Sequence, residues 1–194
     1  MGMKKLFAIA TMCLCACTTV DNKLTYVEEE FFSDAFYMEL PEREEELAFA
    51  EETTTLLGEE MQTPRMETGT VSRDITAFYV LKLYTEDSSW ELVSNVSDAA
   101  SLDEDAIWET GIQNAAARIS SYKDAEIQTL QVDEQPAVLC TAEDESGARQ
   151  YCLMIRSKDR KGCVFLQIGN NQKSYNDILE QIIQHAIDTF HWNQ

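Results

Sequence analysis

The alternation of apolar and polar residues is clearest in the C-terminal half of the chain, where it predicts four strands. They cover residues 125–132, 136–143, 149–156 and 162–168, and they are rich in β-branched and aromatic side chains. Only a few residues connect one strand to the next. Because turns this short join antiparallel neighbours, the sequence predicts an antiparallel meander.

Two stretches with helical spacing enclose the meander. Ser101-Leu102-Asp103-Glu104 has the form of a capping box at the start of the first helix. The second helix is predicted over residues 174–190, and its wide apolar face is typical of a helix that lies on a sheet. The apolar stripes are Trp108, Ile112, Ala115, Ala116 and Ile119 in the first helix, and Tyr175, Ile178, Leu179, Ile182, Ile183, Ala186, Ile187 and Phe190 in the second.

The first half of the chain has weaker patterns. We predict a first strand over residues 31–40, a short strand over 53–58 and a buried strand over 75–84. Residues 90–96 suggest another strand, and residues 61–74 suggest an exposed loop. With the meander and the two helices, these elements predict an α+β fold in which helices cover an antiparallel sheet.

The first seventeen residues have the layout of a secretory signal. Lys4 and Lys5 precede a short apolar run, which is too short to span a bilayer stably. The run ends in Leu14-Cys15-Ala16-Cys17, which resembles a bacterial lipobox, although Cys15 is uncommon at its position. The resemblance implies cleavage after Ala16 and a lipid on Cys17. The alternatives are an ordinary secretory signal or an uncleaved apolar tail.

The remaining chain divides into two parts. Residues 18–30 are polar and acidic and are predicted to be a flexible tether, and residues 31–194 suit a single α+β domain. Thr18 follows the lipobox cysteine, where enterobacterial lipoproteins retained in the inner membrane carry Asp. By resemblance, Thr18 favours the outer membrane, facing the periplasm, over the inner membrane.

The chain is strongly acidic. The net charge is −20, and it becomes −22 without residues 1–17, which contain two lysines and no acid. Such a chain repels nucleic acids, and anionic lipids would repel it too, so membrane attachment is expected through the acyl chains alone.

The Glu-rich residues 42–60, with a weak helical stripe at Leu47, Ala48 and Ala50, suit a solvated face or, alternatively, cation binding. The acidity favours solubility, with a cation or a basic partner as the alternative.

Three cysteines remain after Cys13 and Cys15 leave with the signal and Cys17 is lipidated. If the strands around them pair about Ser146, Cys140 faces Cys152. We expect a non-hydrogen-bonded pair with Cα atoms ~4.5 Å apart, which is just inside disulfide range. The pair is then either a disulfide or two buried free thiols. Cys163, on the next strand, is the odd thiol.

Motifs for catalysis are sparse, and the sequence predicts no enzyme, metal site or cofactor. It has no HExxH, GxSxG, GxGxxG or Gly-rich phosphate loop. His185 lies near the end of the last helix, where the helix dipole favours a histidine. The turn Glu143-Asp144-Glu145 lacks the spaced oxygens of a calcium loop. Trp90 and Trp108 suit packing between sheet and helix, or a ligand groove.

The order of elements from residue 75 onward resembles the PsbP/Mog1-like α/β/α sandwich. Asp133-Glu134-Gln135-Pro136-Ala137 is similar to that family's entry into the meander, and the closing helix with Phe190-His191-Trp192 is similar to its last helix. Gln135 stands where Gly is common, and residues 42–74 do not match. The resemblance implies a protein that binds or scaffolds other proteins, and it transfers no catalytic residue.

We therefore expect a membrane-anchored cell-envelope lipoprotein with a non-enzymatic binding or assembly role toward a protein partner. The alternative is a periplasmic lipoprotein that binds a small ligand or a cation. A deep apolar pocket with convergent polar groups would favour the alternative, and a flat acidic face with an exposed apolar patch would favour the protein partner.

Overall fold

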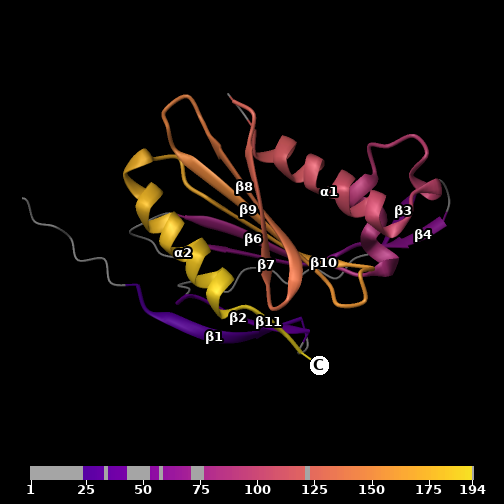
Figure 1. Cartoon of the computed structure of the whole chain (residues 1–194), viewed down its shortest axis with the longest axis horizontal. Helices are drawn as coiled ribbons and strands as arrows, with labels where there is room; N and C mark the ends of the chain where they lie inside the picture. The colour runs from indigo at the N-terminus through magenta and orange to yellow at the C-terminus, as the bar shows by residue number, and fades with distance from the viewer. Residues whose placement is uncertain are drawn as a thin grey trace, which may run out of the picture.

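A six-stranded antiparallel sheet with a helix on each face forms the centre of the computed structural model (Figure 1). The structure describes residues 24–32, 35–42, 53–56, 59–70, 77–120 and 123–193. The strand order is β5-β6-β10-β9-β8-β7. The bounds are Arg65–Thr70 for β5, Phe78–Tyr84 for β6, Glu126–Val132 for β7, Gln135–Glu143 for β8, Arg149–Arg156 for β9 and Cys163–Gly169 for β10.

The predicted meander is confirmed. Strands β7, β8, β9 and β10 pair with their chain neighbours, all antiparallel, and β6 joins the far side of β10. Asp133 and Glu134 form the first turn with φ of 47° and 64°. Positive φ at both central residues defines a type I′ turn, whose twist matches that of the flanking strands. Gly147, at φ 79°, takes the left-handed position in the next turn.

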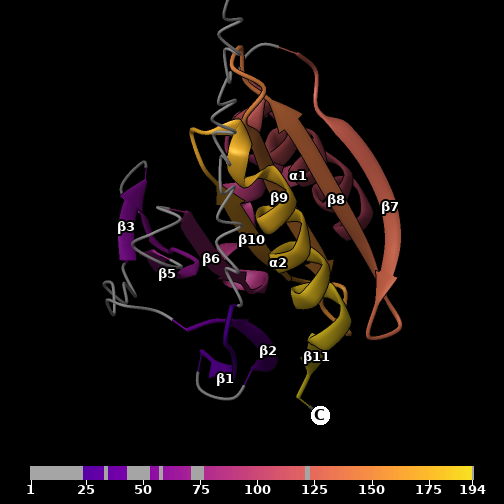
Figure 2. The ribbon, with the colours of Figure 1, turned by 90° about the vertical axis from the view of Figure 1, so that its left-hand side faces the viewer.

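The two faces of the sheet carry two separate apolar clusters, because successive side chains in a strand point to opposite faces. One face packs under α2 (Asn176–Thr189) and the other under α1 (Glu104–Ile119), and Figure 2 shows these helices on opposite sides of the sheet. On the α2 side the cluster includes Leu81, Leu153, Ile155, Leu166 and Ile168, and on the α1 side it includes Val138, Cys140, Cys152, Met154 and Phe165. The predicted class, an antiparallel sheet covered by helices, is therefore confirmed.

Helix α1 begins two residues later than the predicted capping box requires. Asp103 is the N-cap, and its carboxylate accepts the Ala106 N–H at 2.8 Å. Ser101 belongs instead to a short 3-10 helix, η2 (Ala99–Ser101). Gly111 sits on the buried face, where an added Cβ would lie 3.4 Å from the Met154 side chain. A Cβ at this position would make an ordinary van der Waals contact, so the packing of α1 on the sheet does not require glycine here.

The expected strand over residues 90–96 is wrong. Residues Glu86–Val93 form a 3-10 helix, η1, with Thr85 and Ser88 as a reciprocal capping box. Leu92 and Val93 are buried beside α1. The apolar residues that suggested a strand therefore pack through a helical turn, and the capping residues before them decide the conformation.

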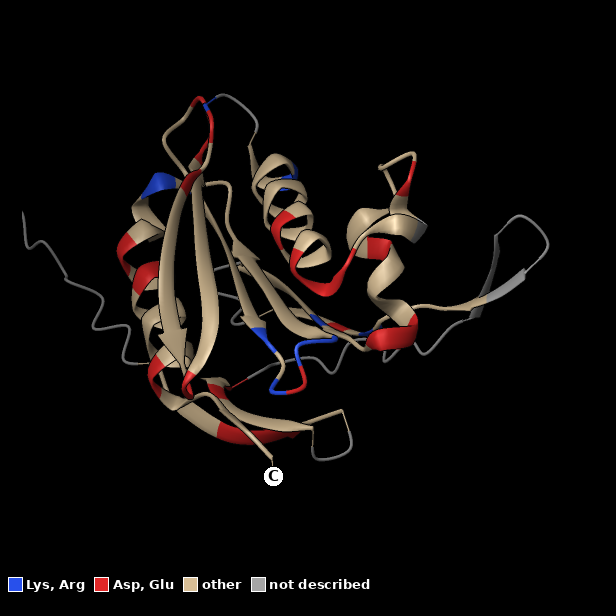
Figure 3. Ribbon diagram, turned by 45° about the vertical axis from the view of Figure 1, so that its right-hand side comes forward, with Lys and Arg blue, Asp and Glu red and all other residues tan. Residues whose placement is uncertain are grey.

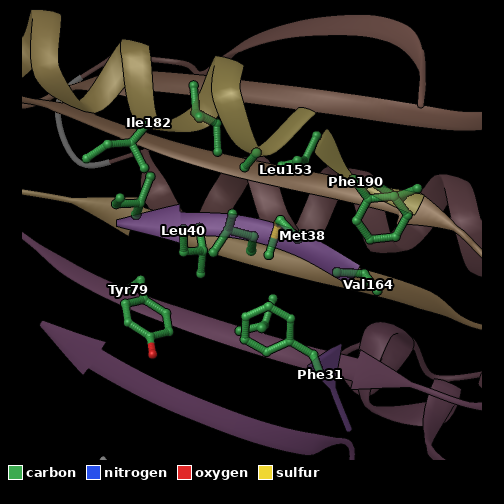
Figure 4. Close-up of a cluster of buried hydrophobic side chains, with 14 of the residues drawn as sticks. Phe31, Met38, Leu40, Tyr79, Leu153, Val164, Ile182 and Phe190 are labelled. Atoms are coloured by element: carbon green, nitrogen blue, oxygen red, sulfur yellow. The ribbon is translucent and has the colours of Figure 1, made fainter. Parts of the chain in front are cut away.

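Helix α2 confirms the predicted second helix. It follows a 3-10 turn, η3 (Lys173–Tyr175), and buries its apolar stripe against β9, β10 and β2. Figure 4 shows Ile182 and neighbouring side chains in this cluster. The side chains of Leu179, Ile182 and Ala186 are fully buried. The helix therefore holds two sheets together.

The second of these sheets is small and consists of β1 (Tyr26–Phe31), β2 (Phe36–Pro41) and β11 (His191–Trp192), in the order β1-β2-β11. The single strand expected over residues 31–40 is thus two strands joined near Phe32, which has φ of 54°. Residues 26–30, expected within the tether, form most of β1. They pair with β2, so strand structure is present at positions where the sequence predicts a tether.

Two further hairpin strands, β3 (Thr53–Leu56) and β4 (Glu59–Gln62), confirm the short strand expected near residue 53. The loop expected over residues 61–74 is wrong where β5 pairs with β6. Residues 1–17, with the lipobox, lie outside the described residues, as do Leu47, Ala48 and Ala50. No helix in the described ranges is both long and apolar enough to cross a bilayer.

Candidate functional site

Strand β7 forms one end of the large sheet, and no described residue pairs with its outer edge (Figure 2). Its sequence, Glu-Ile-Gln-Thr-Leu-Gln-Val, is exposed at residues 126–129 and again at Gln131. Ile127 keeps 40% of its surface exposed. An edge strand offers a row of unpaired N–H and C=O groups, so β7 is a ready template for another strand.

The hairpin turn determines which backbone groups of β7 point outward. In the type I′ turn at Asp133–Glu134, the Val132 carbonyl accepts the Gln135 N–H, which makes 132 and 135 a hydrogen-bonded pair. Hydrogen-bonded and non-hydrogen-bonded pairs alternate along an antiparallel ladder. Every second residue of β7 therefore directs its N–H and C=O away from β8. These residues are Ile127, Thr129 and Gln131.

The turn between β8 and β9 leads to the same assignment of inward and outward backbone groups. The Arg149 N–H donates to Asn176 Oδ1 at 2.9 Å and not across the β8–β9 ladder, so Glu143 and Arg149 form a non-hydrogen-bonded pair. Counting back along β8, Leu139 and Thr141 direct their backbone groups toward β7. Two independent turns thus agree on the outward groups of β7.

The edge lacks the usual features that prevent strands from associating. Natural edge strands are commonly protected by lysines, prolines or bulges. The register of β7 on β8 runs without a bulge from Glu126 to Val132, and within β7 only Glu126 is charged. Residues 127–132 are therefore an uncharged stretch of edge strand in a chain whose net charge is −20.

A groove of about 470 Å³ lies on the α2 face of the sheet beside this edge. Glu126 and Gln128 line it from β7, Tyr151 lies on its sheet side, and Glu180 and Ile183 line it from α2. Helix α2 packs on β9, β10 and β2, and on this face the first half of β7, at Glu126 and Gln128, stays exposed, whereas Val132 at its other end is buried. The position of the helix therefore creates the groove.

Ion pairs organise the far wall of the groove. Arg149 Nε lies 3.0 Å from Glu143 Oε1, and Arg149 Nη1 lies 3.3 Å from Glu180 Oε2. The hydrogen bond from Arg149 lowers the pKa of Glu143. Lys123 Nζ is 4.0 Å from the same glutamate. Both cations of the groove therefore already have carboxylate partners, and Glu126 has no ion pair within the described ranges.

Tyr151 is the buried polar residue of the groove. Its residue is 3% exposed, and its hydroxyl lies near the Arg149 guanidinium without the geometry of a regular hydrogen bond. Burial raises the pKa of Tyr151, and the neighbouring Arg149 guanidinium opposes that rise. The hydroxyl oxygen is closed to solvent, so Tyr151 contributes its ring, and not its hydroxyl, to the lining of the groove.

The cysteines lie on the other face of the sheet. The predicted register is confirmed, because Cys140 is paired with Cys152, and Cys163 lies one strand further on, in β10. The expected non-hydrogen-bonded pairing is wrong, because the alternation of pairs along β8 and β9 makes 140 and 152 a hydrogen-bonded pair. Such a pair has a Cα separation of ~5.5 Å, which is still within disulfide range. All three are buried free thiols in the structure. The 140–152 disulfide remains a prediction.

Burial makes these thiols poor nucleophiles. It raises the pKa of Cys140 to about 11 and that of Cys163 to about 12. Burial also raises the pKa of Cys152. Because the thiolate is the reactive form, the folded protein holds them mainly in an unreactive state at neutral pH.

His185 has a structural partner that the sequence does not reveal. Its Nε2 lies 2.6 Å from Glu39 Oε2, and its ring centroid lies 3.8 Å from that of Tyr26. The histidine thus joins α2 to both β1 and β2, in addition to the helix-end position predicted for it. His191 stacks on Tyr37 in the small sheet.

The other expected candidates also have structural roles. Trp108 lies under the Arg156 guanidinium at 5.7 Å, and that buried arginine donates to Asp105 at 2.7 Å. Trp90 Nε1 donates to the Gln62 carbonyl. Asp144 closes its own turn by accepting the Ala148 N–H, and no metal-binding group of His, Cys, Asp or Glu is found among the described residues.

The comparisons with known proteins add structural similarity only. No family model matches the chain, and no curated protein matches it. Among solved structures, the Ran-binding protein Mog1p of Saccharomyces cerevisiae is 15% identical, with a TM-score of 0.48, over 87% of this chain and 96% of its own. The cyanobacterial PsbP of Synechocystis sp. PCC 6803 is 10% identical, with a TM-score of 0.46, over 93% and 99%.

A third similar structure is LpqN of Mycobacterium tuberculosis, described as involved in cell envelope biogenesis. It is 10% identical, with a TM-score of 0.42, over 90% of this chain and 94% of its own. At these identities the likeness concerns the arrangement of strands and helices, so the functional argument depends on the chain's own residues.

Proposed function

We propose that this chain is a lipid-anchored protein of the cell envelope that binds a protein partner by accepting one of its strands at β7. It has a non-enzymatic role in binding or assembly. The lipid is on Cys17, and the outer membrane, on its periplasmic side, is the favoured location. The observation that carries the proposal is the regular, uncharged and unpaired outer edge of β7.

Strand addition uses the backbone groups that β7 leaves outward. In this mode of recognition, main-chain hydrogen bonds provide affinity and alternate side chains provide specificity. Ile127, Thr129 and Gln131 each offer one N–H and one C=O. A partner strand therefore gains a ladder of several hydrogen bonds without rearrangement of the sheet.

The charge around β7 selects the partner. Acidic residues lie at both ends of the strand: Asp124 precedes it, Glu126 is its first residue, and Asp133 and Glu134 follow it. The chain has 35 acidic and 15 basic residues, and acidic positions predominate along the coloured ribbon in Figure 3. The matching strand has an uncharged centre and basic residues toward its ends.

A second copy of this chain fits the edge poorly. Two β7 strands paired antiparallel about Thr129 would place Asp124 of each copy opposite Glu134 of the other. Like charges directly opposite each other in a sheet are destabilising. Each copy also carries a net charge of −22 after loss of residues 1–17, so a basic partner is favoured over self-association.

The anchor keeps this surface near the membrane. Eight residues separate Cys17 from Tyr26, the first residue of β1. At full extension such a segment spans at most ~29 Å. The partner is therefore a protein of the membrane or of the space next to it.

The experiment compares two substitutions at one outward position of β7. Thr129→Pro removes an N–H that points away from β8, so the hairpin keeps its own hydrogen bonds, whereas Thr129→Val keeps the N–H and a β-branched side chain. The lipidated proteins are cross-linked in intact envelopes of the source cells and captured. We expect a specific cross-linked partner with wild type and with Thr129→Val, and its loss with Thr129→Pro.

Circular dichroism and thermal melting show whether the proline variant is folded. If it is not, Gln131→Pro, near the end of the strand, takes its place with Gln131→Val as its control. Equal capture by a folded proline variant and its valine control contradicts strand addition at β7.

A further inference from the structure

The apolar core under α1 ends between β8 and β7. Ile127 is paired with Cys140, and both side chains lie on the α1 face of the sheet. The same holds for Thr129 and Val138. Both β8 residues are buried in the cluster under α1, whereas both β7 residues are exposed, Ile127 at 40%. A strand added outside β7 would therefore lie beside an exposed apolar side chain at the rim of a packed core.

Ile127 combines an exposed apolar side chain with an outward backbone. Single exposed apolar side chains are common, but this residue also directs its N–H and C=O away from β8. A strand laid along β7 would cover the side chain and bond the backbone at once. Val27, in the edge strand β1, is exposed too, but three glutamates follow it directly. Charges of this kind protect a sheet edge, and β7 has none from Ile127 to Val132.

The α2 face of the same segment is polar. Glu126 and Gln128 point to this face and are exposed. Side chains of an added strand beside them would stay next to polar groups and water, so apolar residues would gain little burial there. The two faces of β7 over residues 126–129 therefore favour different side chains in a partner.

We infer that the strand that pairs with β7 is amphipathic, with apolar side chains on the α1 face and polar ones on the α2 face. The inference rests on the proposed function and specifies the sequence pattern of the partner. Successive side chains of a strand point to opposite faces, so the apolar residues recur at every second position, beside Ile127 and Thr129. β-Branched and aromatic residues suit these positions, because their cross-strand pairs stabilise a sheet.

The test uses two synthetic peptides as probes of the edge. Each has a lysine at both ends; between the lysines, the first peptide alternates threonine and valine, and the second has threonine throughout. Amide and methyl spectra of the lipidated protein in a non-ionic detergent are recorded during titration with each peptide. We expect the valine peptide to bind at least about fivefold more tightly, with nuclear Overhauser contacts from its valine methyls to Ile127 and Thr129. Equal affinity of the two peptides, or valine contacts to Gln128 in place of Ile127, would overturn the inference.

Matched variants attribute the difference in affinity to Ile127. Ile127→Thr should weaken binding of the valine peptide at least about threefold and that of the threonine peptide less than about twofold. Ile127→Val keeps an apolar β-branched side chain, and Gln128→Thr alters the α2 face, so each should leave both affinities within about twofold of wild type. Equal losses for the two peptides with Ile127→Thr would overturn the inference. If this variant does not fold, the valine contacts in the wild type decide between the two faces.

The inference and the proposed function fail in distinguishable ways. Thr129→Pro should abolish binding of both peptides as well as capture of the envelope partner. If capture is lost with Thr129→Pro, but neither peptide binds the wild type or the valines contact the α2 face, strand addition stands and the amphipathic pattern is wrong. If peptide binding and capture both survive in a folded Thr129→Pro variant, strand addition itself is wrong, and the inference fails with it.

Discussion

Truncation of Ile182 should destabilise the whole fold, because α2 connects the two sheets. Ile182 is fully buried in the cluster that joins α2, the large sheet and β2 (Figure 4). Leu153 of β9 and Leu40 of β2 belong to the same cluster. The change Ile182→Ala therefore opens a cavity at the place where the small sheet is held against the large one.

The size of the effect follows from the atoms removed. The substitution deletes three buried carbon groups at ~0.8 kcal/mol each, or ~2.4 kcal/mol of lost burial. The residual cavity adds to this, and buried Ile→Ala changes generally cost about 2–5 kcal/mol. We expect a loss of about 3–4 kcal/mol, which is a large part of the ~5–15 kcal/mol that stabilises an ordinary domain. Ile182→Asp should cost still more, because it buries an unpaired carboxylate.

Urea denaturation followed by circular dichroism and tryptophan fluorescence measures this loss. The matched control is Gln181→Ala, an exposed neighbour on the same helix, which should change the free energy of unfolding by no more than ~0.5 kcal/mol. A loss below ~1 kcal/mol for Ile182→Ala, less than the burial of one or two carbon groups, would refute the docking of α2.

Three further predictions concern the anchor, the thiols and one surface carboxylate, Asp105. Cys17→Ala should release the protein from the membrane fraction, and an unmodified N-terminus in the mature wild type would contradict lipidation. Peptide mapping without reduction should find a bridge between Cys140 and Cys152, and quantitative free thiol at both positions would contradict it. Hydrogen bonding from buried Arg156 lowers the pKa of Asp105 in the folded protein. The ionised carboxylate therefore stabilises the fold at pH values above its unfolded pKa. This contribution is lost as the pH falls through the lowered folded pKa. Asp105→Asn should therefore reduce the loss of stability between pH 5 and pH 2, and an unchanged acid profile would contradict this role.

The elements with strong periodicity could be predicted from the sequence. The meander and α2 have regular apolar patterns, and the short turns around residues 133 and 146 fix their antiparallel pairing. The register of Cys140 on Cys152 followed from the symmetry of one turn. Whether this pair is hydrogen-bonded could not be predicted from the sequence, because it depends on the bond from the Arg149 N–H to Asn176, 27 residues away.

The errors have local physical causes. The apolar residues Leu92 and Val93 suit a strand or a turn of helix, and the capping residues Thr85 and Ser88 decide for the helix. Strand β5 carries few apolar residues and forms because β6 pairs with it. Propensity is a weak guide where pairing with a distant segment supplies the stabilisation.

The candidate site was not foreseen, because it depends on tertiary placement. Sequence alone indicates that the first strand of a meander has an outer side, but not that it stays uncovered. The groove arises from the position of α2 over β9 and β10, and the ring on its sheet side belongs to Tyr151, a residue unremarkable in the sequence. The pairing of Glu39 with His185 joins residues 146 positions apart and leaves no local signal.

Amide hydrogen exchange along β7 tests the central claim most directly. In the free protein, the amides of Ile127, Thr129 and Gln131 should exchange rapidly, while those of Gln128 and Leu130, bonded to β8, should be protected. In the complex captured from the envelope, the three outward amides should gain protection of at least tenfold. Unchanged exchange at all three, in a complex shown to be intact, would contradict binding by strand addition at β7.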